Sequence, residues 1–132
     1  MREMKAWYDA TPKQKIERWE NVLRVLKGLS PHERQKHWSM SDWVVKTECG
    51  TVACAAGHCG LDPWFRRRGF RMGVRYDDWT CPEDFFGYEG STRIFYNYKK
   101  RPVSQVIKEV KAHIKLLKTR KLEEEVLGAL EE

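Results

Sequence analysis

The sequence predicts a mainly α-helical fold: one compact domain, residues 1–132, packed around a central helix of small residues. Apolar residues recur at helical spacing in two stretches, near the N-terminus and near the C-terminus, and a run of small residues lies between them. The chain length suits one domain, since domains typically run ~100–150 residues, and 41% hydrophobic residues can fill a core. We therefore expect the small-residue helix at the centre of the molecule.

The chain shows no signal for a membrane or for export. No apolar run approaches the ~18 residues that a membrane span needs. The first residues are charged and lack the apolar stretch of a signal peptide. We expect a cytoplasmic protein without a membrane partner, whose four cysteines stay reduced.

The first two helices are predicted from their start signals. Thr11, followed by Pro12 and then Gln14, forms a capping-box pattern for a helix that Gly28 ends. Ser30 repeats this signal for a short helix to about Lys36. The first helix carries one apolar stripe: Ile16, Trp19, Val22, Leu23, Leu26 and Leu29.

The central helix is predicted within the segment from Cys49 to Gly60. Thr51 is expected to cap it, and Gly60 suits its end. The residues from Val52 to Cys59 are nearly all small, which lets neighbouring elements approach closely. The sequence therefore predicts that this helix is buried.

Shorter elements are expected in the second half. Asp62 and Pro63 start a short helix that Gly69 stops. Residues 70–76 alternate apolar and basic side chains, which is strand periodicity and predicts one short strand or a hairpin. Two short helices follow, at 82–86 and 91–97. The last helix begins near Pro102 with the stripe Val103, Val106, Ile107, Val110, Ile114 and Leu117.

The C-terminal segment, residues 119–132, is left open between two forms. It either continues the last helix or starts another, and in both forms it is expected to protrude as an acidic helix. Five of its last ten residues are glutamates. All 25 basic residues but only 14 of the 19 acidic ones lie in residues 1–122, which carry a net charge of +11. Such a charge favours phosphate-bearing or acidic partners.

The middle of the chain resembles a known group of proteins. Met40-Ser41-x-Trp43, the run Cys49-Gly50-Thr51-x-x-Cys54-x-x-Gly57 and a late Ile94-Phe95-Tyr96 are similar to small bacterial and phage proteins that share a C-G-T-x-x-C-x-x-G core motif. The chain departs from that pattern at His58 and Cys59, where members carry aromatic or apolar residues. The resemblance is compatible with a phage origin and implies no mechanism.

The cysteines and one histidine are candidate metal ligands. Cys54 and His58 are four residues apart and would share a helix face, with Cys49 and Cys81 as further ligands. Zinc needs four such ligands in a tetrahedron, and this spacing is irregular, so we expect buried free thiols and no cofactor. A thiol enzyme with Cys49 as nucleophile and His58 as base is a further alternative.

The segment from Trp64 to Tyr76 carries the strongest functional signal. It holds five arginines and no acidic residue. Guanidinium groups hold phosphate oxygens in pairs and stack on flat rings, and aromatic side chains can stack a base. The candidate ligand-binding residues are Trp64, Arg66, Arg67, Arg68, Arg71 and Arg75, with Lys99, Lys100 and Arg101 expected on the same face.

These observations favour a non-enzymatic binding protein. Its ligand is expected to carry phosphates: a nucleotide, a signalling oligonucleotide or a nucleic-acid strand. In a phage setting it would sequester a host signal or block a host factor. The alternative is an interaction module that docks on an acidic host defence protein through the same face. The zinc or thiol protein is the second alternative, and a homo-oligomer stays open.

Overall fold

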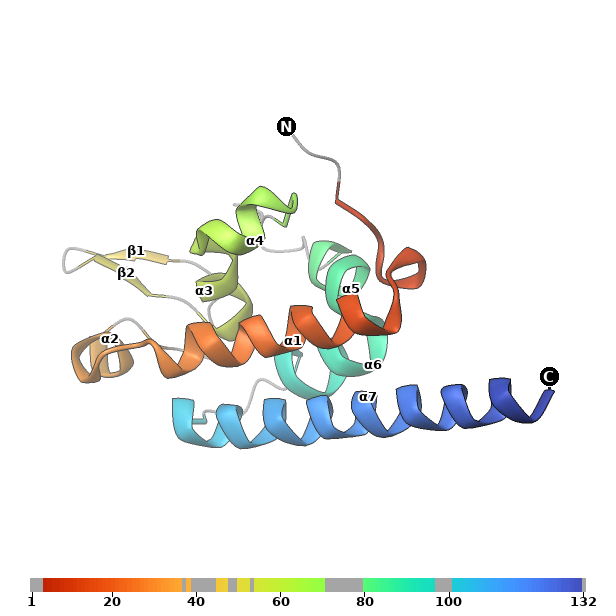
Figure 1. Ribbon diagram of the computed structural model, residues 1–132. Helices are drawn as coiled ribbons and strands as arrows, with labels where there is room; N and C mark the ends of the chain where they lie inside the picture. Colours follow the sequence, from red (N-terminus) through yellow and green to blue (C-terminus); the bar gives the residue numbers. More distant parts are fainter. Residues whose placement is uncertain are drawn as a thin grey trace.

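The computed structural model describes residues 4–36, 38, 45–47, 50–52, 54–70, 80–96 and 101–131, and it confirms a mainly α fold (Figure 1). Within these residues the elements are η1 (Trp7–Asp9), α1 (Pro12–Lys27), α2 (Pro31–Lys36), β1 (Val45–Thr47), β2 (Gly50–Val52), α3 (Ala55–Leu61), α4 (Pro63–Arg67), α5 (Thr80–Phe86), α6 (Tyr88–Gly90), η2 (Ser91–Phe95) and α7 (Val103–Glu131).

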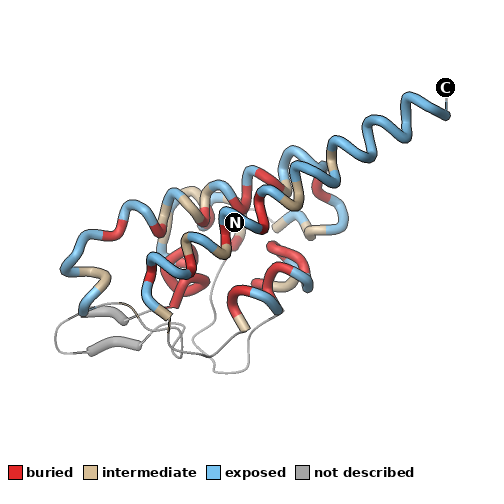
Figure 2. The backbone as a smooth tube through the Cα atoms, turned by 90° about the horizontal axis from the view of Figure 1, so that it is seen from below, coloured by how far each residue is buried: buried red, intermediate tan, exposed pale blue. Residues whose placement is uncertain are grey.

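Helix α1 lies in the middle of the molecule (Figure 1). The long helix α7 runs along one side of α1, and α3 contacts α1 from the other side. Helix α4 follows α3 and lies farther from α1. The short helices α5 and α6 fill the space near the start of α1. In the perpendicular view, the C-terminal end of α7 is exposed and extends past the rest of the chain (Figure 2).

The two predicted start signals are confirmed. The Thr11 side chain accepts a hydrogen bond from the Gln14 backbone, and the Gln14 side chain accepts one from the Thr11 N–H. Ser30 and Glu33 make the same reciprocal pair before α2. These bonds satisfy backbone donors that a helix otherwise leaves unpaired at its start.

The central helix is buried as predicted, but its start is later than expected. Ala55 to Gly60 are all buried. Thr51 does not cap this helix, because it pairs with Lys46 in the antiparallel hairpin of β1 and β2. Helix α3 therefore begins at Ala55 after an extended Cys54, and Gly60 lies inside the helix, which continues to Leu61.

The short elements of the second half also have local causes. Asp62 accepts a hydrogen bond from the Trp64 N–H and caps α4. Gly69 and Gly87 have φ angles of 85° and 84°, a conformation that glycine adopts without strain. Helices α5 and η2 correspond to the helices predicted at 82–86 and 91–97. Apart from Phe70, the predicted strand at 70–76 lies outside the described residues.

The core is aromatic. Six rings from α1, the α4 region, α5 and η2 are fully buried and pack mostly edge to face or tilted, with centroids 4.9–5.7 Å apart. Such pairs stabilise a fold beyond the area that they bury. The rings are Trp19, Phe65, Phe70, Phe85, Phe86 and Phe95. Helices far apart in the sequence are thus held around one cluster.

Helix α7 settles the question left open for the C-terminal segment. It is continuous from Val103 to Glu131. Val103, Val106, Val110 and Ile114 of its predicted stripe are buried, and Ile107 and Leu117 pack against the core from partly exposed positions. Residues 122–131 are all exposed. No helix among the described residues is long and apolar enough to cross a membrane.

Candidate functional site

The α4 arginine face, which comprises Trp64, Arg66, Arg67 and Arg68, is the described part of the predicted site. Arg66 and Arg67 are exposed. Arg68 stacks its guanidinium 3.7 Å from the centroid of the Trp64 ring and donates a hydrogen bond to the Trp64 carbonyl. Trp64 itself packs edge to face on the buried Phe65. The stack therefore joins a charged surface group to the core through one flat ring.

Positive charge also lies beneath this face. Arg18 of α1 is buried and donates hydrogen bonds to the carbonyls of Phe85 and Lys5. Burial, together with the nearby charge of Arg68, lowers the pKa of Arg18 to about 10. A fixed, buried guanidinium next to Arg68 raises the positive potential that an anion would meet at this surface.

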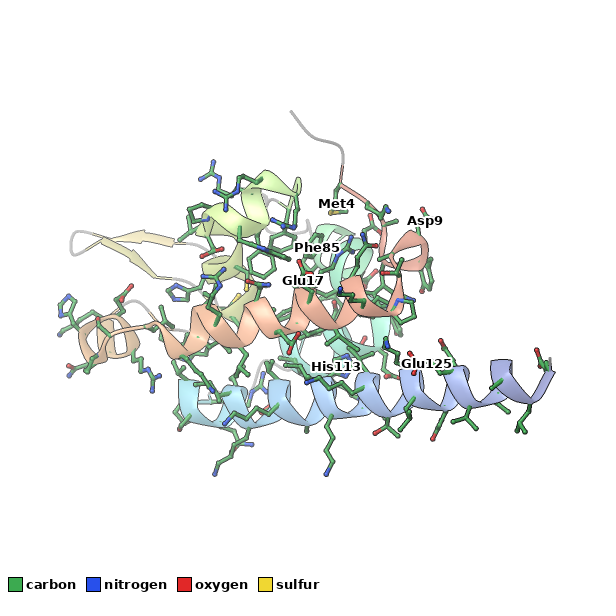
Figure 3. The ribbon with its side chains drawn as sticks, viewed as in Figure 1. Met4, Asp9, Glu17, Phe85, His113 and Glu125 are labelled. Carbon is green, nitrogen blue, oxygen red and sulfur yellow. The ribbon has the colours of Figure 1, made fainter. Side chains whose placement is uncertain are left out.

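The carboxylates near the face are partly neutralised. Arg24 binds Asp62 through both of its terminal nitrogens, at 3.2 and 2.8 Å. Burial alone would raise the pKa of Asp62, but the hydrogen bonds from Arg24 and from the backbone, together with the charge of Arg24, hold this pKa below its usual range. Glu17 approaches Arg68 only to 4.0 Å, and both side chains are exposed. Figure 3 labels Glu17 on α1. The surface around α4 is thus net basic.

The structure does not bring every predicted residue to this face. Arg101 lies before α7, and Figure 1 shows α4 and α7 on opposite sides of α1. Arg101 is largely buried, pairs with Glu109 and donates to the Ile94 carbonyl, so it holds η2 against α7. Its predicted placement beside the α4 arginines was wrong, because the contacts with Glu109 and Ile94 hold its side chain beside α7 and η2. Arg71, Arg75, Lys99 and Lys100 lie outside the described residues.

The cysteine and histidine cluster is described only in part. Cys54 and Cys59 are buried, and burial raises the pKa of Cys59 well above its usual value, so this thiol keeps its proton. His58 is buried and stacks on Trp38 with centroids 5.8 Å apart. Among the described residues no three potential ligands lie close enough to hold a metal ion. Cys49 and the side chain of Cys81 are not described.

A cleft of about 430 Å³ lies at the other end of the molecule, between η1, α6 and α7. Its walls include Trp7, Tyr88 and the ion pair of Arg120 with Glu89. His113 lines its floor between α1 and α7 (Figure 3) and is T-stacked against Trp19. Neither ring nitrogen of His113 has a hydrogen-bond partner in the described part of the chain.

Sequence reasoning missed both Arg18 and His113. Each lies on the apolar stripe of its helix, Arg18 beside Trp19 and His113 beside Ile114. The sequence signal that could have identified them is a charged or polar residue within an otherwise apolar, buried stripe. The partner carbonyls of Arg18, on Lys5 and Phe85, are 13 and 67 residues away, so no local pattern could identify them.

No family model, curated protein or solved structure matches the chain significantly. These comparisons therefore suggest no ligand. A ligand class has to be inferred from the chemistry of the residues themselves.

Proposed function

We propose that this protein is a non-enzymatic binding protein that holds a phosphate-bearing ligand on its α4 arginine face. The observation that supports this most directly is the stack of Arg68 on Trp64 at 3.7 Å, with Arg66 and Arg67 exposed in the helix that precedes Arg68. A stacked guanidinium has lost much of its freedom before the ligand arrives. Less entropy is then lost when it donates to a phosphate.

The ligand class follows from the same groups. A planar guanidinium donates two parallel hydrogen bonds to phosphate oxygens, and flat aromatic or guanidinium surfaces can accept a base by stacking. The proposed ligand is therefore a nucleotide, a signalling oligonucleotide or a nucleic-acid strand. The resemblance to small bacterial and phage proteins is compatible with a protein that sequesters a host signal.

The experiment measures binding of nucleotides, cyclic oligonucleotides and short DNA and RNA strands by calorimetry. Three proteins are compared: the wild type, the double variant Arg66→Glu/Arg67→Glu, and the control Lys27→Glu/Lys36→Glu, which makes the same charge change at exposed sites outside α4. We expect the first double variant to lose at least tenfold in affinity and the control to lose much less. Arg68→Lys keeps the charge but not the planar stack, and it should also weaken binding.

Salt dependence separates the ligand classes. Binding of a strand should weaken steeply as salt rises, because release of condensed counterions drives it. A small nucleotide should respond much less. The proposal fails if nothing binds more tightly than about 100 μM, or if the arginine variant and the control bind alike. The same face would then fit an acidic host protein better, which co-purification of a second chain would reveal.

A further inference from the structure

The C-terminal end of α7 exposes an apolar face. Val126, Leu127 and Leu130 are 52%, 59% and 77% exposed. At 3.6 residues per turn, this face points roughly to the opposite side of α7 from the stripe that packs on α1. No other described helix or strand lies on that side (Figure 1). Contiguous exposed apolar residues of this kind are typical of an interaction surface.

The charges on the same helix are segregated by sign. Six basic residues and one acidic residue lie from Val103 to Lys121, whereas four glutamates and no basic residue lie from Leu122 to Glu131. Several of these charges make no ion pair within the described residues. They are Lys108, Lys111, Lys115, Glu123, Glu124 and Glu131. The helix is therefore basic in its first two thirds and acidic at its end.

We infer that two copies of this chain associate through α7 in an antiparallel arrangement. Reversed helices bring the acidic end of each α7 alongside the basic stretch of the other. Opposite charges then attract at both ends of the contact. A parallel pair would oppose like charges along its whole length. Two-fold symmetry makes the contact self-complementary, so one surface suffices.

The side chains suit this arrangement. A two-fold axis near Lys121 places Val126 opposite Leu116 of the second copy and Glu123 within about one turn of its Lys115. The apolar end of one helix then covers Ala112 and Leu116 of the other, together with the aliphatic stems of its lysines. The bodies of the two copies lie on opposite sides of the helix pair, because α1 and the other described helices all lie on one side of α7 (Figures 1 and 2).

Sedimentation equilibrium on four variants tests the inference. The wild type is expected to dimerise and to dissociate as salt rises. Val126→Ser/Leu130→Ser should be monomeric, as should the basic-stretch reversal Lys108→Glu/Lys111→Glu/Lys115→Glu and the acidic-end reversal Glu123→Lys/Glu124→Lys/Glu131→Lys. The control Lys5→Glu/Lys27→Glu/Lys36→Glu makes the same charge change elsewhere and should dimerise like the wild type. All substituted positions are exposed, and circular dichroism checks that each variant folds.

Mixing the two reversed variants should restore a dimer, since the new basic end of one complements the new acidic stretch of the other. Zero-length coupling of carboxylates to amines in a mixture of light and isotope-labelled wild type should link Glu123 of one copy to Lys115 of the other. A wild type that stays monomeric up to about 1 mM, reversed variants that still dimerise alone, or the absence of any link between the acidic end and the basic stretch would each overturn the inference.

Discussion

Arg18 and His113 are both buried, and they differ in how their polar groups are satisfied. Two terminal nitrogens of Arg18 donate to backbone carbonyls at 2.8 Å, and its guanidinium lies 4.1 Å from the Phe85 ring centroid. His113 has apolar and aromatic neighbours and no described partner for either nitrogen. Leaving a buried polar group unpaired costs ~1–3 kcal/mol, so the two residues should affect stability in opposite ways.

The pH dependence of the free energy of unfolding should reflect the protonation of His113. Burial lowers the pKa of this imidazole; Glu89 of α6 opposes the shift, while Arg93 of η2 and Arg120 of α7 add to it. Below its unperturbed pKa of 6.5, the unfolded chain binds a proton that the folded chain takes up only at lower pH. The free energy of unfolding should therefore fall as the pH drops below about 6.5, by at most ~1.4 kcal/mol per pH unit from this group.

Replacing the imidazole tests this. His113→Leu should remove that component of the pH dependence, measured as urea unfolding at a series of pH values between roughly 7 and 5. At neutral pH the substitution should cost little stability or add some, because both unpaired nitrogens are removed. His32→Leu, which removes an exposed imidazole, is the control. Parallel pH profiles for the wild type and His113→Leu would contradict the assignment.

At the scale of elements, the closest approach is where α6 meets α1 and α7. A Cβ at Gly90 would lie 2.4 Å from Cζ2 of Trp19 and 2.8 Å from Nε2 of His113. Only a residue without a side chain fits between these rings. The glycine thus lets three helices meet around one aromatic contact, and it leaves room for His113 to pack against Trp19.

Two glycine substitutions measure this contact. Gly90→Ala should destabilise the protein by about 1–3 kcal/mol, because the added methyl group overpacks a filled space. Gly128→Ala is the matched control, since a Cβ there meets nothing within 4 Å, and alanine in an exposed helix should stabilise by ~0.5–1 kcal/mol. Both values come from urea unfolding. Equal effects of the two changes would show that α6 does not approach α1 as closely as described.

At the scale of the whole molecule, the folded body and the end of α7 are separable. The buried residues of α7 extend from Val103 to Ile114, Leu117 packs from a partly exposed position, and residues 122–131 are exposed. The acidic end therefore contributes little to the core, although it carries most of the negative charge of the helix. Stability and surface charge depend on different parts of the chain.

Truncating α7 tests whether its C-terminal end contributes to the stability of the folded body. A chain that stops after Lys121 is expected to unfold within about 0.5 kcal/mol of the full chain, the usual range for surface changes, when both are measured at high dilution. A chain that stops after Leu116 also loses Leu117 and the pair of Arg120 with Glu89, and it should be less stable. A large loss in the first truncation would mean that residues 122–131 pack on the body.

The sequence by itself determined the local features. The capping boxes at Thr11 and Ser30, the Asp62 cap and the apolar stripes of α1 and α7 all depend on residues within a few positions of one another. Such signals are readable because helix caps and helix faces are set by short-range backbone geometry. The burial of the small-residue segment was also predictable, because small side chains let neighbouring elements approach closely.

Only the tertiary structure decided the rest. Pairing of β2 with β1 moved the start of α3 from Thr51 to Ala55. Arg68 lies on the α4 face while Arg101 pairs with Glu109 beside α7, although both belong to basic runs in the sequence. The burial of Arg18 and His113 depends on helices contributed by distant segments. Composition and spacing show which groups a chain carries, but long-range packing decides which of them meet, which are desolvated and which remain available to a ligand.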